Sequence, residues 1–316
     1  MSSETSLAVY RAEAVHAGLP WAALAQAIAD AFANPGVTAP TRHAHGLSER
    51  DALLLMPAWD ERLIVTKLVT VLPAAEPTVQ ATLIALDRAS GRPLALIDGE
   101  AVTLRRTAAT SAWVAARLAA RRERLLLVGT GALAPWMARA YLALVPDLAT
   151  VEVWARQPAR AVAVAAALAA TPEAAGRPVT PAADLPTAVG HADMICCATT
   201  ATEPIVHGAW LTAGTHLDLV GGFRTSMREI DDAAIMRAFV LVDTYAGALK
   251  EAGDLVVPLE HGILERERIF AELSGWVRNP IRPSTTGADL TLFKSVGTAI
   301  EDLAAVRCLL APAARH

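Results

Sequence analysis

The chain has 316 residues, of which 53% are hydrophobic and 19% charged, and its formal net charge is -4. This length exceeds what one hydrophobic core usually serves, so two domains are expected. A broad nucleic-acid or anionic-membrane surface needs clustered positive charge, and the overall balance argues against both kinds of partner.

The three cysteines are an odd number, and Cys196 and Cys197 are adjacent. That spacing suits neither a disulfide framework nor a zinc site, so we expect a reducing compartment, the cytoplasm, and interpret the pair as core residues. Met1 to Glu13 lacks a basic stretch followed by an apolar run, so it is not typical of a secretion signal. No apolar run approaches the roughly 20 residues that span a bilayer.

In chain order, three early segments are rich in Val, Thr, Leu and Ile: Leu63–Leu72, Thr78–Asp87 and Leu94–Ile97. Turns containing Pro, Gly and Asp separate them, and this pattern predicts neighbouring antiparallel strands. We therefore expect a second α+β domain, for substrate, in residues 1–115, completed by residues 300–316. Thr107–Arg122 is predicted to be a helix that leads out of it.

From Leu125 onward, short apolar runs alternate with longer helical patterns, as in an α/β Rossmann domain with a doubly wound parallel sheet. We expect this domain in residues 116–299. The predicted strands are Leu125–Val128, Thr150–Trp154, Met194–Ala198, His216–Val220 and Phe239–Val242, and the predicted helices are Ala132–Leu144, Pro158–Ala170, Arg228–Ala238 and Leu290–Leu310.

Residues 125–134 read as an apolar strand, a Gly-x-Gly-x-x-Ala turn and a helix start. Gly129 permits the tight turn, Gly131 lets backbone amides approach a pyrophosphate, and Ala134 lets helix and strand pack closely. The surrounding strand and helix patterns favour dinucleotide binding over an ordinary strand-helix turn.

The end of the second predicted strand usually supplies an acid that binds the ribose hydroxyls of NAD. Here the sequence is Trp154-Ala155-Arg156, and Arg156 could accept a 2'-phosphate instead. This favours NADP over NAD, although a solvated surface arginine is an equal alternative.

Several motifs resemble the ornithine cyclodeaminase and mu-crystallin family between about Arg42 and Leu303. They are Leu54-Leu-Met-Pro57, Lys67-Leu-Val, Arg106-Thr-Ala-Ala-Thr-Ser111, Gly129-Thr-Gly131, Asp243, Glu251-Ala-Gly-Asp-Leu255, Thr291-Leu-Phe-Lys-Ser-Val-Gly297 and Glu301-Asp302. The resemblance implies a homodimer formed through the antiparallel domain, and an NAD(H)- or NADP(H)-binding Rossmann domain. It implies that Arg42, Lys67 and Arg106 surround a substrate carboxylate.

The residues fit these implied roles. Arg106 precedes the predicted helix at Thr107, where its guanidinium and a helix N-terminus could face one carboxylate; Arg105 is its competitor. Lys67 lies in an apolar predicted strand, which would lower its pKa and suit it to catalytic proton transfer, whereas the alternative is an edge-strand lysine that discourages aggregation. The predicted cofactor-binding residues are Thr107, Gly129, Thr130, Gly131, Ala132, Leu133, Arg156, Thr199, Thr200, Val220 and Lys294.

Two positions depart from the cyclodeaminase pattern. Phe223 follows Gly221-Gly222 where cyclodeaminases carry an aspartate, and Leu54 stands where they place a glutamate. Leu133 also replaces the common Gln of the glycine loop. Asp218 is five residues from Phe223 along a predicted strand, too far to replace the missing acid. The departures favour imine reduction or amino-acid dehydrogenation over cyclodeamination.

Other candidate sites are weaker. His43 and His45 would share one face of an extended segment, but no third metal ligand is spaced nearby, so no metal is expected. Glu251, Asp254 and Glu260 are interpreted as a solvated acidic stretch.

The sequence therefore predicts NAD(P)-dependent hydride transfer at the alpha carbon of a small amino or imino acid. In one direction such an enzyme would reduce a ketimine or pyrroline-2-carboxylate to an amino acid, and in the other it would dehydrogenate the amino acid. Ornithine cyclodeamination to proline and ammonia is one alternative. A non-catalytic, NADPH-binding, crystallin-like protein is another, against which the retention of Lys67 and Arg106 argues.

Overall fold

The computed structural model describes residues 7–281 and 288–311 of the chain. The first six residues of the segment considered for a secretion signal, and the last five of the predicted 300–316 segment, lie outside this range. The chain divides into two compact units. Unit 1 comprises Met1–Arg106 with Thr298–His316, and unit 2 comprises Thr107–Gly297.

Unit 1 is built on a six-stranded sheet in the order β1-β6-β5-β4-β3-β2. Its neighbours pair antiparallel from β2 through β6, and only β1 runs parallel to β6. The antiparallel sheet predicted for the early part of the chain is confirmed. The strands are β1 (Ala8–Tyr10), β2 (His43–Gly46), β3 (Ala52–Trp59), β4 (Leu63–Val71), β5 (Val79–Asp87) and β6 (Pro93–Asp98).

Alternation along β4 separates the two faces of this sheet. Val65, Lys67 and Val69 are buried, whereas Thr66 and Leu68 between them are only partly buried. Helix α11 (Ala299–Leu310) packs on β3 and β4 and on α2 (Trp21–Ala33). The period of two therefore places Lys67 among apolar side chains on the buried face, as its sequence context predicts. The remaining helix wholly within this unit is α1 (Ala12–Gly18).

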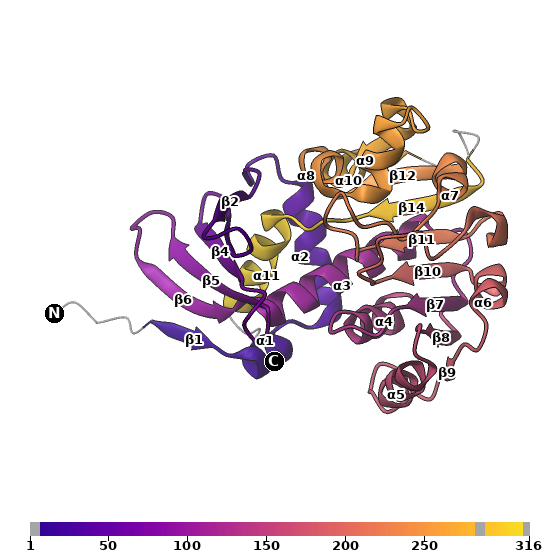
Figure 1. Cartoon of the computed structure of the whole chain (residues 1–316). Helices are drawn as coiled ribbons and strands as arrows, with labels where there is room; N and C mark the ends of the chain where they lie inside the picture. Colours follow the sequence, from indigo (N-terminus) through magenta and orange to yellow (C-terminus); the bar gives the residue numbers. More distant parts are fainter. Residues whose placement is uncertain (1–6, 282–287, 312–316) are drawn as a thin grey trace. The chain divides into compact units, whose positions relative to one another are not determined.

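Unit 2 is a Rossmann-type, eight-stranded parallel sheet in the order β13-β12-β14-β11-β10-β7-β8-β9, and Figure 1 shows the strands from β12 to β9 side by side in this order. All five predicted strands are present, with ends that shift by at most a residue or so. The strands are β7 (Arg124–Val128), β8 (Thr150–Trp154), β9 (Val179–Pro181), β10 (Met194–Cys197), β11 (His216–Leu219), β12 (Ala238–Val242), β13 (Ile269–Glu272) and β14 (Leu290–Lys294).

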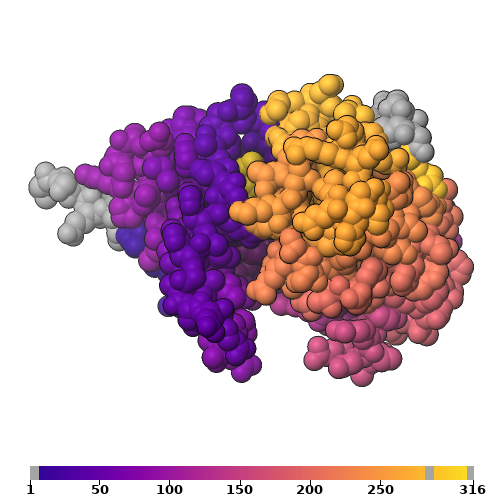
Figure 2. Space-filling view, turned by 45° about the horizontal axis from the view of Figure 1, so that its top comes forward, coloured from indigo at the N-terminus to yellow at the C-terminus, as the bar shows by residue number. Residues whose placement is uncertain are grey.

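Helices follow most of these strands, as the alternating pattern predicts. They are α4 (Ala134–Leu144), α5 (Pro158–Ala169), α6 (Leu185–His191), α7 (Asp232–Arg237), α8 (Tyr245–Glu251), α9 (Gly253–Glu260) and α10 (Leu273–Arg278). Helix α5 packs on β8 and β9 at one edge of the sheet, where it forms the projecting lobe of unit 2 in Figure 2. Helices α8 to α10 make up the orange part of that view.

One predicted helix, Leu290–Leu310, is wrong in its first part. Residues Leu290–Lys294 form β14, a strand whose side chains are all buried, paired in parallel with β11 and β12. The helix begins only at Ala299. A short run buried on both faces of a parallel sheet has no alternation to distinguish it from a buried helix.

The predicted start of the helix at Thr107 is also wrong. Helix α3 spans Gly99–Leu118, and the carboxylate of Asp98 accepts a hydrogen bond from Ala101 N at 2.8 Å, so an aspartate caps the helix well upstream. The predicted helix Arg228–Ala238 is likewise too long: α7 starts at Asp232, with Asp231 as its N-cap. In the described ranges, no helix is long and apolar enough to cross a membrane.

Candidate functional site

A hollow of about 550 Å³ opens where β7, β8 and β10 of unit 2 end. The carboxyl ends of parallel strands meet at one edge of such a sheet, and ligands of open α/β folds bind there. Six of the predicted cofactor-binding residues line this hollow: Gly129, Thr130, Gly131, Arg156, Thr199 and Thr200. The hollow therefore collects residues from three separate strand ends.

The two glycines of the turn have different physical reasons. Gly129 has φ +121°, its N–H donates to Trp154 O at 3.0 Å, and a Cβ there would lie 2.5 Å from Ala198 O. The Gly129 backbone thus passes close to the chain that leaves β10. Gly131 is exposed, and a Cβ added to it would meet no atom of the protein within 4 Å. The space beside Gly131 is free for a ligand, and the helix α4 behind it has no side-chain cap, so the residues fit a pyrophosphate.

The side of the hollow that follows the end of β8 carries positive charge. Arg156 and Arg160 line it beside Gln157, and both arginines are exposed. Glu203 is the acid among the lining residues, but it does not come from the end of β8, where NAD-binding turns usually supply one. The arginines therefore offer a fork for a phosphate at this position.

The other predicted cofactor residues do not line this hollow: Thr107, Ala132, Leu133, Val220 and Lys294. Lys294 is fully buried, and its Nζ lies 3.1 Å from Asp254 Oδ2 and 3.9 Å from Glu229 Oε2. Its ammonium is paired inside unit 2. Direct cofactor contact by these five residues stays a prediction.

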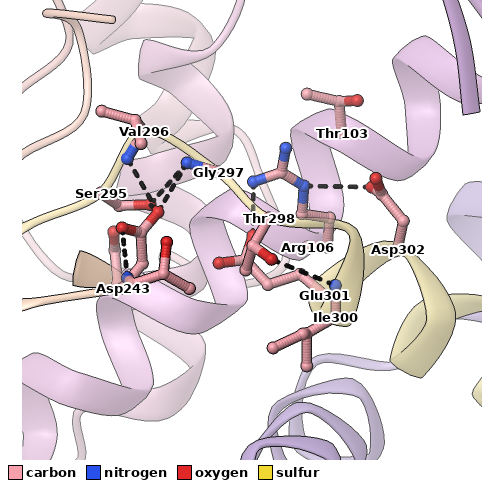
Figure 3. A network of polar contacts seen from close by, with 12 residues as sticks. Thr103, Arg106, Asp243, Ser295, Val296, Gly297, Thr298, Ile300, Glu301 and Asp302 are labelled. Atoms are coloured by element: carbon pink, nitrogen blue, oxygen red, sulfur yellow. Dashed lines mark hydrogen bonds and ion pairs between the residues drawn. The ribbon is translucent and has the colours of Figure 1, made fainter. Parts of the chain in front are cut away.

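Unit 1 contains a buried cluster of four charged side chains. Lys67 Nζ lies 2.9 Å from Asp302 Oδ2 and 3.3 Å from Thr103 Oγ1, and Arg106 Nε lies 3.3 Å from Asp302 Oδ1. Arg106 also pairs with Glu301 through NH1. Figure 3 shows Arg106 between these two carboxylates. Asp302 therefore bridges the two cations that the sequence predicts to bind one substrate carboxylate.

Burial lowers the pKa of Lys67 from its ordinary value, while Asp302 beside it acts in the opposite direction and the nearby Arg106 lowers it further. The predicted direction of the shift is confirmed, and its principal cause is the apolar surroundings on β4. A lysine whose ammonium is destabilised in this way gives up its proton more readily than one in water.

The predicted placement of Arg106 at a helix start is wrong. Arg106 lies in the interior of α3, so neither free backbone amides nor the helix N-terminus face its guanidinium. Arg105, its competitor, donates to Leu19 O and stacks over the Trp21 ring at 3.6 Å. The two neighbouring arginines point to different partners, and Arg106 is the one that joins Lys67.

The start of α11 delivers the two carboxylates. Thr298 is the N-cap, and its hydroxyl accepts from Ile300 N at 3.4 Å. Glu301 and Asp302 then lie in the first turn, the position in which acidic side chains are stabilised by the helix dipole. In the sequence these two residues are recognisable only as a motif. The strand-turn-helix arrangement around them explains why both carboxylates are buried in unit 1.

Asp243 holds the turn that follows β14 in unit 2. Its Oδ2 accepts from Ser295 Oγ, Val296 N and Gly297 N at 3.1, 2.9 and 2.7 Å, contacts that Figure 3 also draws. Gly297 has φ +83°, a conformation that favours glycine. The Asp243 carboxylate thereby fixes the chain that leaves β14.

The remaining sequence candidates fall away from these clusters. His43 and His45 are exposed on β2, and among the described residues no group of acids, histidines and cysteines is arranged to hold a metal. Arg42 precedes β2 with a partly buried side chain, and its role with the carboxylate stays a prediction. Phe223 is 42% exposed, in the loop after β11.

Two interpretations of polar or sulfur residues have different outcomes. Cys196 and Cys197 are fully buried on β10, which confirms them as core residues. The interpretation of a solvated acidic stretch is wrong for Asp254, which is fully buried and paired with Lys294. Asp218 is buried as well, and its carboxylate accepts from Ser111 Oγ and Tyr141 OH at 2.9 Å each. Asp218 thus faces two hydroxyl groups in the core.

Comparison with known proteins agrees with this geometry. The model of the ornithine cyclodeaminase/mu-crystallin family matches residues 6–314. A Delta(1)-pyrroline-2-carboxylate reductase of Colwellia psychrerythraea is 34% identical over 96% of this chain and 98% of its own length. One from Paracoccus denitrificans is 38% identical over 72% and 71%. The solved structure of the Thermococcus litoralis Delta(1)-pyrroline-2-carboxylate reductase, in complex with NADH and L-proline, has a TM-score of 0.87 at 26% identity and covers 96% of each chain.

Substituting the two glycines separates folding from ligand approach. Gly131→Ala meets only open space, so the thermal stability should stay within about 1 °C while the dissociation constant for NAD(P)H rises on the order of tenfold. Gly129→Ala should lower the free energy of unfolding by about 1–3 kcal/mol, because its φ is strained and its methyl group meets Ala198 O. Calorimetric titration and thermal unfolding measure both, and unchanged NAD(P)H affinity in Gly131→Ala would contradict the assignment.

Proposed function

Because the chain belongs to the ornithine cyclodeaminase/mu-crystallin family, we propose that it is an NAD(P)H-dependent reductase of a small cyclic imino acid of the pyrroline-2-carboxylate type. The observation that carries this proposal is the buried pair of cations on unit 1, Lys67 and Arg106, joined by Asp302. A carboxylate substrate needs such a pair, because an isolated charge is costly to bury.

Each cation has a separate role in the proposed reaction. The planar guanidinium of Arg106 suits a carboxylate, which it can hold with two parallel hydrogen bonds. Lys67, with its lowered pKa, holds a proton that it can deliver to the imine nitrogen. Asp302 lies between the two and keeps their heads together. A substrate held in this way presents the carbon next to its carboxylate.

The nicotinamide cofactor supplies a hydride, and the hollow at Gly129 and Gly131 is where its pyrophosphate would bind. In the proposed step, the carbon bearing the carboxylate would accept that hydride while the imine nitrogen takes one proton, so the carbon-nitrogen double bond would become a single bond. The product would be a cyclic amino acid, with the nicotinamide left oxidised. Run in reverse, the same groups would dehydrogenate the amino acid.

Cyclodeamination is less well supported. It would require an acid beside the reacting carbon, and Phe223 and Leu54 stand at the two positions where cyclodeaminases carry one. A phenylalanine ring accepts no proton. The buried acids beside these cations, Glu301 and Asp302, already pair with Arg106 and Lys67. Hydride transfer without ring closure therefore fits the side chains better.

We extend the proposal to a homodimer that forms through the open face of the unit 1 sheet. Several partly buried side chains on that face are apolar and lie opposite one another across the strands: Leu55 and Leu68, Ile64 and Leu86, and Ile84 and Leu96. Such a patch is costly in water and is typical of an interface.

Free, buried thiols at Cys196 and Cys197 suit a reducing compartment, so we propose the cytoplasm as the location of the protein.

A substrate panel tests the activity directly. Purified protein should oxidise NADPH or NADH with pyrroline-2-carboxylate and form proline, and Lys67→Met should lower kcat/KM at least on the order of a hundredfold because it removes the proton donor. Absorbance at the nicotinamide band follows the reaction. Ammonia and proline from ornithine, without net cofactor oxidation, would instead establish cyclodeamination, and tight NADPH binding with no turnover of any imino or amino acid would establish a binding protein.

The pH profile tests the role of Asp302. If protonated Lys67 is the acid, kcat/KM falls as the pH rises through its pKa. Asp302 raises that pKa, so Asp302→Asn should move the high-pH limb of the profile to lower pH. Glu301→Gln is the matched control, since it also removes one buried carboxylate but one that pairs with Arg106. It should raise KM for the imino acid more than it moves the limb. An unmoved limb in Asp302→Asn would exclude this role.

We also propose NADPH rather than NADH as the preferred cofactor, on the basis of Arg156 and Arg160 in the hollow. Arg156→Ser should lower the ratio of kcat/KM for NADPH to that for NADH by roughly tenfold to a hundredfold, the value of a charge-assisted contact to a phosphate. Steady-state kinetics with both cofactors measures the ratio, with Arg139→Ser, which lies outside the hollow, as the control. Wild-type protein that favours NADH would contradict this preference.

A further inference from the structure

Glu229 is a buried carboxylate with donors from two different segments of unit 2. Its Oε1 accepts from Thr199 N and from Thr199 Oγ1, each at 2.9 Å. Its Oε2 accepts from Gly221 N at 3.0 Å and from Gly222 N at 3.4 Å. The side chain is fully buried. One carboxylate thus joins two stretches of backbone that are far apart in sequence.

These stretches lie at the edge of the sheet where the cofactor hollow opens. Thr199 follows β10 and lines the hollow, and Gly221 and Gly222 follow β11, which pairs in parallel with β10. A Cβ on Gly221 would overlap Thr199 O and the Glu229 carboxylate, so only glycine allows the two turns to approach this closely. Phe223, the residue that replaces the cyclodeaminase acid, comes directly after them.

Further charged groups hold Glu229 in place. Asp254 Oδ1, from α9, accepts from Glu229 N at 2.7 Å and from Ile230 N at 3.2 Å. Lys294, from β14, lies 3.1 Å from Asp254 Oδ2 and 3.9 Å from Glu229 Oε2. One ammonium thus faces two carboxylates in the interior. Burial raises the pKa of Glu229, Lys294 lowers it and Asp254 raises it, and the net result is a pKa of about 7. The Cys197 thiol on β10 is another titratable group nearby.

We propose that Glu229 is a positioning residue for cofactor binding, which fixes the turn after β10 to the turn after β11, and that Asp254 and Lys294 form one buried ionic group with it. The inference rests on the proposed NAD(P)H site but assigns a role to residues outside the hollow. It also gives Lys294 a function: its charge is used to keep Glu229 ionised within the protein. Glu229 acts through Thr199 and the two glycines rather than by touching the cofactor.

The ionised carboxylate is the form that this arrangement requires. Four donors converge on the two oxygens, and a protonated acid would turn a donor toward one of them. Glutamine has the same shape, but its amide nitrogen would face the N–H groups of Thr199 or of the glycines. Either change should loosen the link between the two turns, and cofactor affinity should fall although every residue of the hollow is unchanged.

Titration with NAD(P)H tests the proposal in the full-length protein. Glu229→Gln should raise the dissociation constant for the cofactor on the order of tenfold at pH 8. The affinity of the wild-type protein should weaken as the pH falls through about 7, as Glu229 takes up a proton, and this dependence should be absent in Glu229→Gln. Glu229→Asp keeps the charge but is too short to reach both segments, so it should also weaken binding.

Asp193→Asn is the matched control. Asp193 is a buried carboxylate of the same unit that accepts from Glu123 N and Arg124 N at the start of β7 and β10, the opposite edge of the sheet. It should lower thermal stability without changing cofactor affinity. Equal NAD(P)H affinity and an equal pH dependence in wild-type protein and both folded Glu229 variants would overturn the positioning role. A wild-type protein that binds no NAD(P)H would instead remove the proposed function on which it rests.

Discussion

Charges removed from water must be paired inside the protein, and this constraint governs the functional residues of both units. A buried ion left without a partner is strongly destabilising. In unit 1 the acids of the first turn of α11 face Lys67 and Arg106. In unit 2 Lys294 faces Asp254 and Glu229. Removing any one partner therefore affects both the fold and the position of the groups that bind ligands.

The ion pair with Asp302 only partly offsets the effect of burial on the Lys67 ammonium, and this suits catalysis. Burial lowers the pKa of Lys67 although a carboxylate lies 2.9 Å away, so the surroundings destabilise the ammonium more than Asp302 stabilises it. A proton held there is available to a substrate nitrogen at a modest cost. A substrate carboxylate beside Lys67 would also stabilise its buried ammonium. One side chain would therefore link carboxylate binding to proton transfer.

Much of the fold follows from local pattern. Strand and helix alternation predicts the parallel sheet, and the Gly129 turn predicts where the hollow opens, because each of these two signals lies in residues close in sequence. The ion-pair partners of Lys67 and Arg106 cannot be predicted in this way. Asp302 is 235 residues from Lys67 along the chain, and Glu301 is 195 residues from Arg106. In addition, β14 before them has the sequence pattern of a buried helix. The resemblance to the family motif selects Arg106 over Arg105, and Arg106 is the one that shares Asp302 with Lys67, yet its predicted place at a helix start is wrong. Asp254 shows why composition misleads: an acidic run reads as solvated unless the buried lysine it meets is known.

In the proposed reaction, the carbon next to the imino-acid carboxylate receives a hydride directly from the nicotinamide. Cofactor deuterated at the transferred position, with pyrroline-2-carboxylate in ordinary water, tests this transfer by NMR of the proline formed. Deuterium is expected at the alpha carbon and nowhere else in the ring. Proline carrying only solvent hydrogen at that carbon would contradict it.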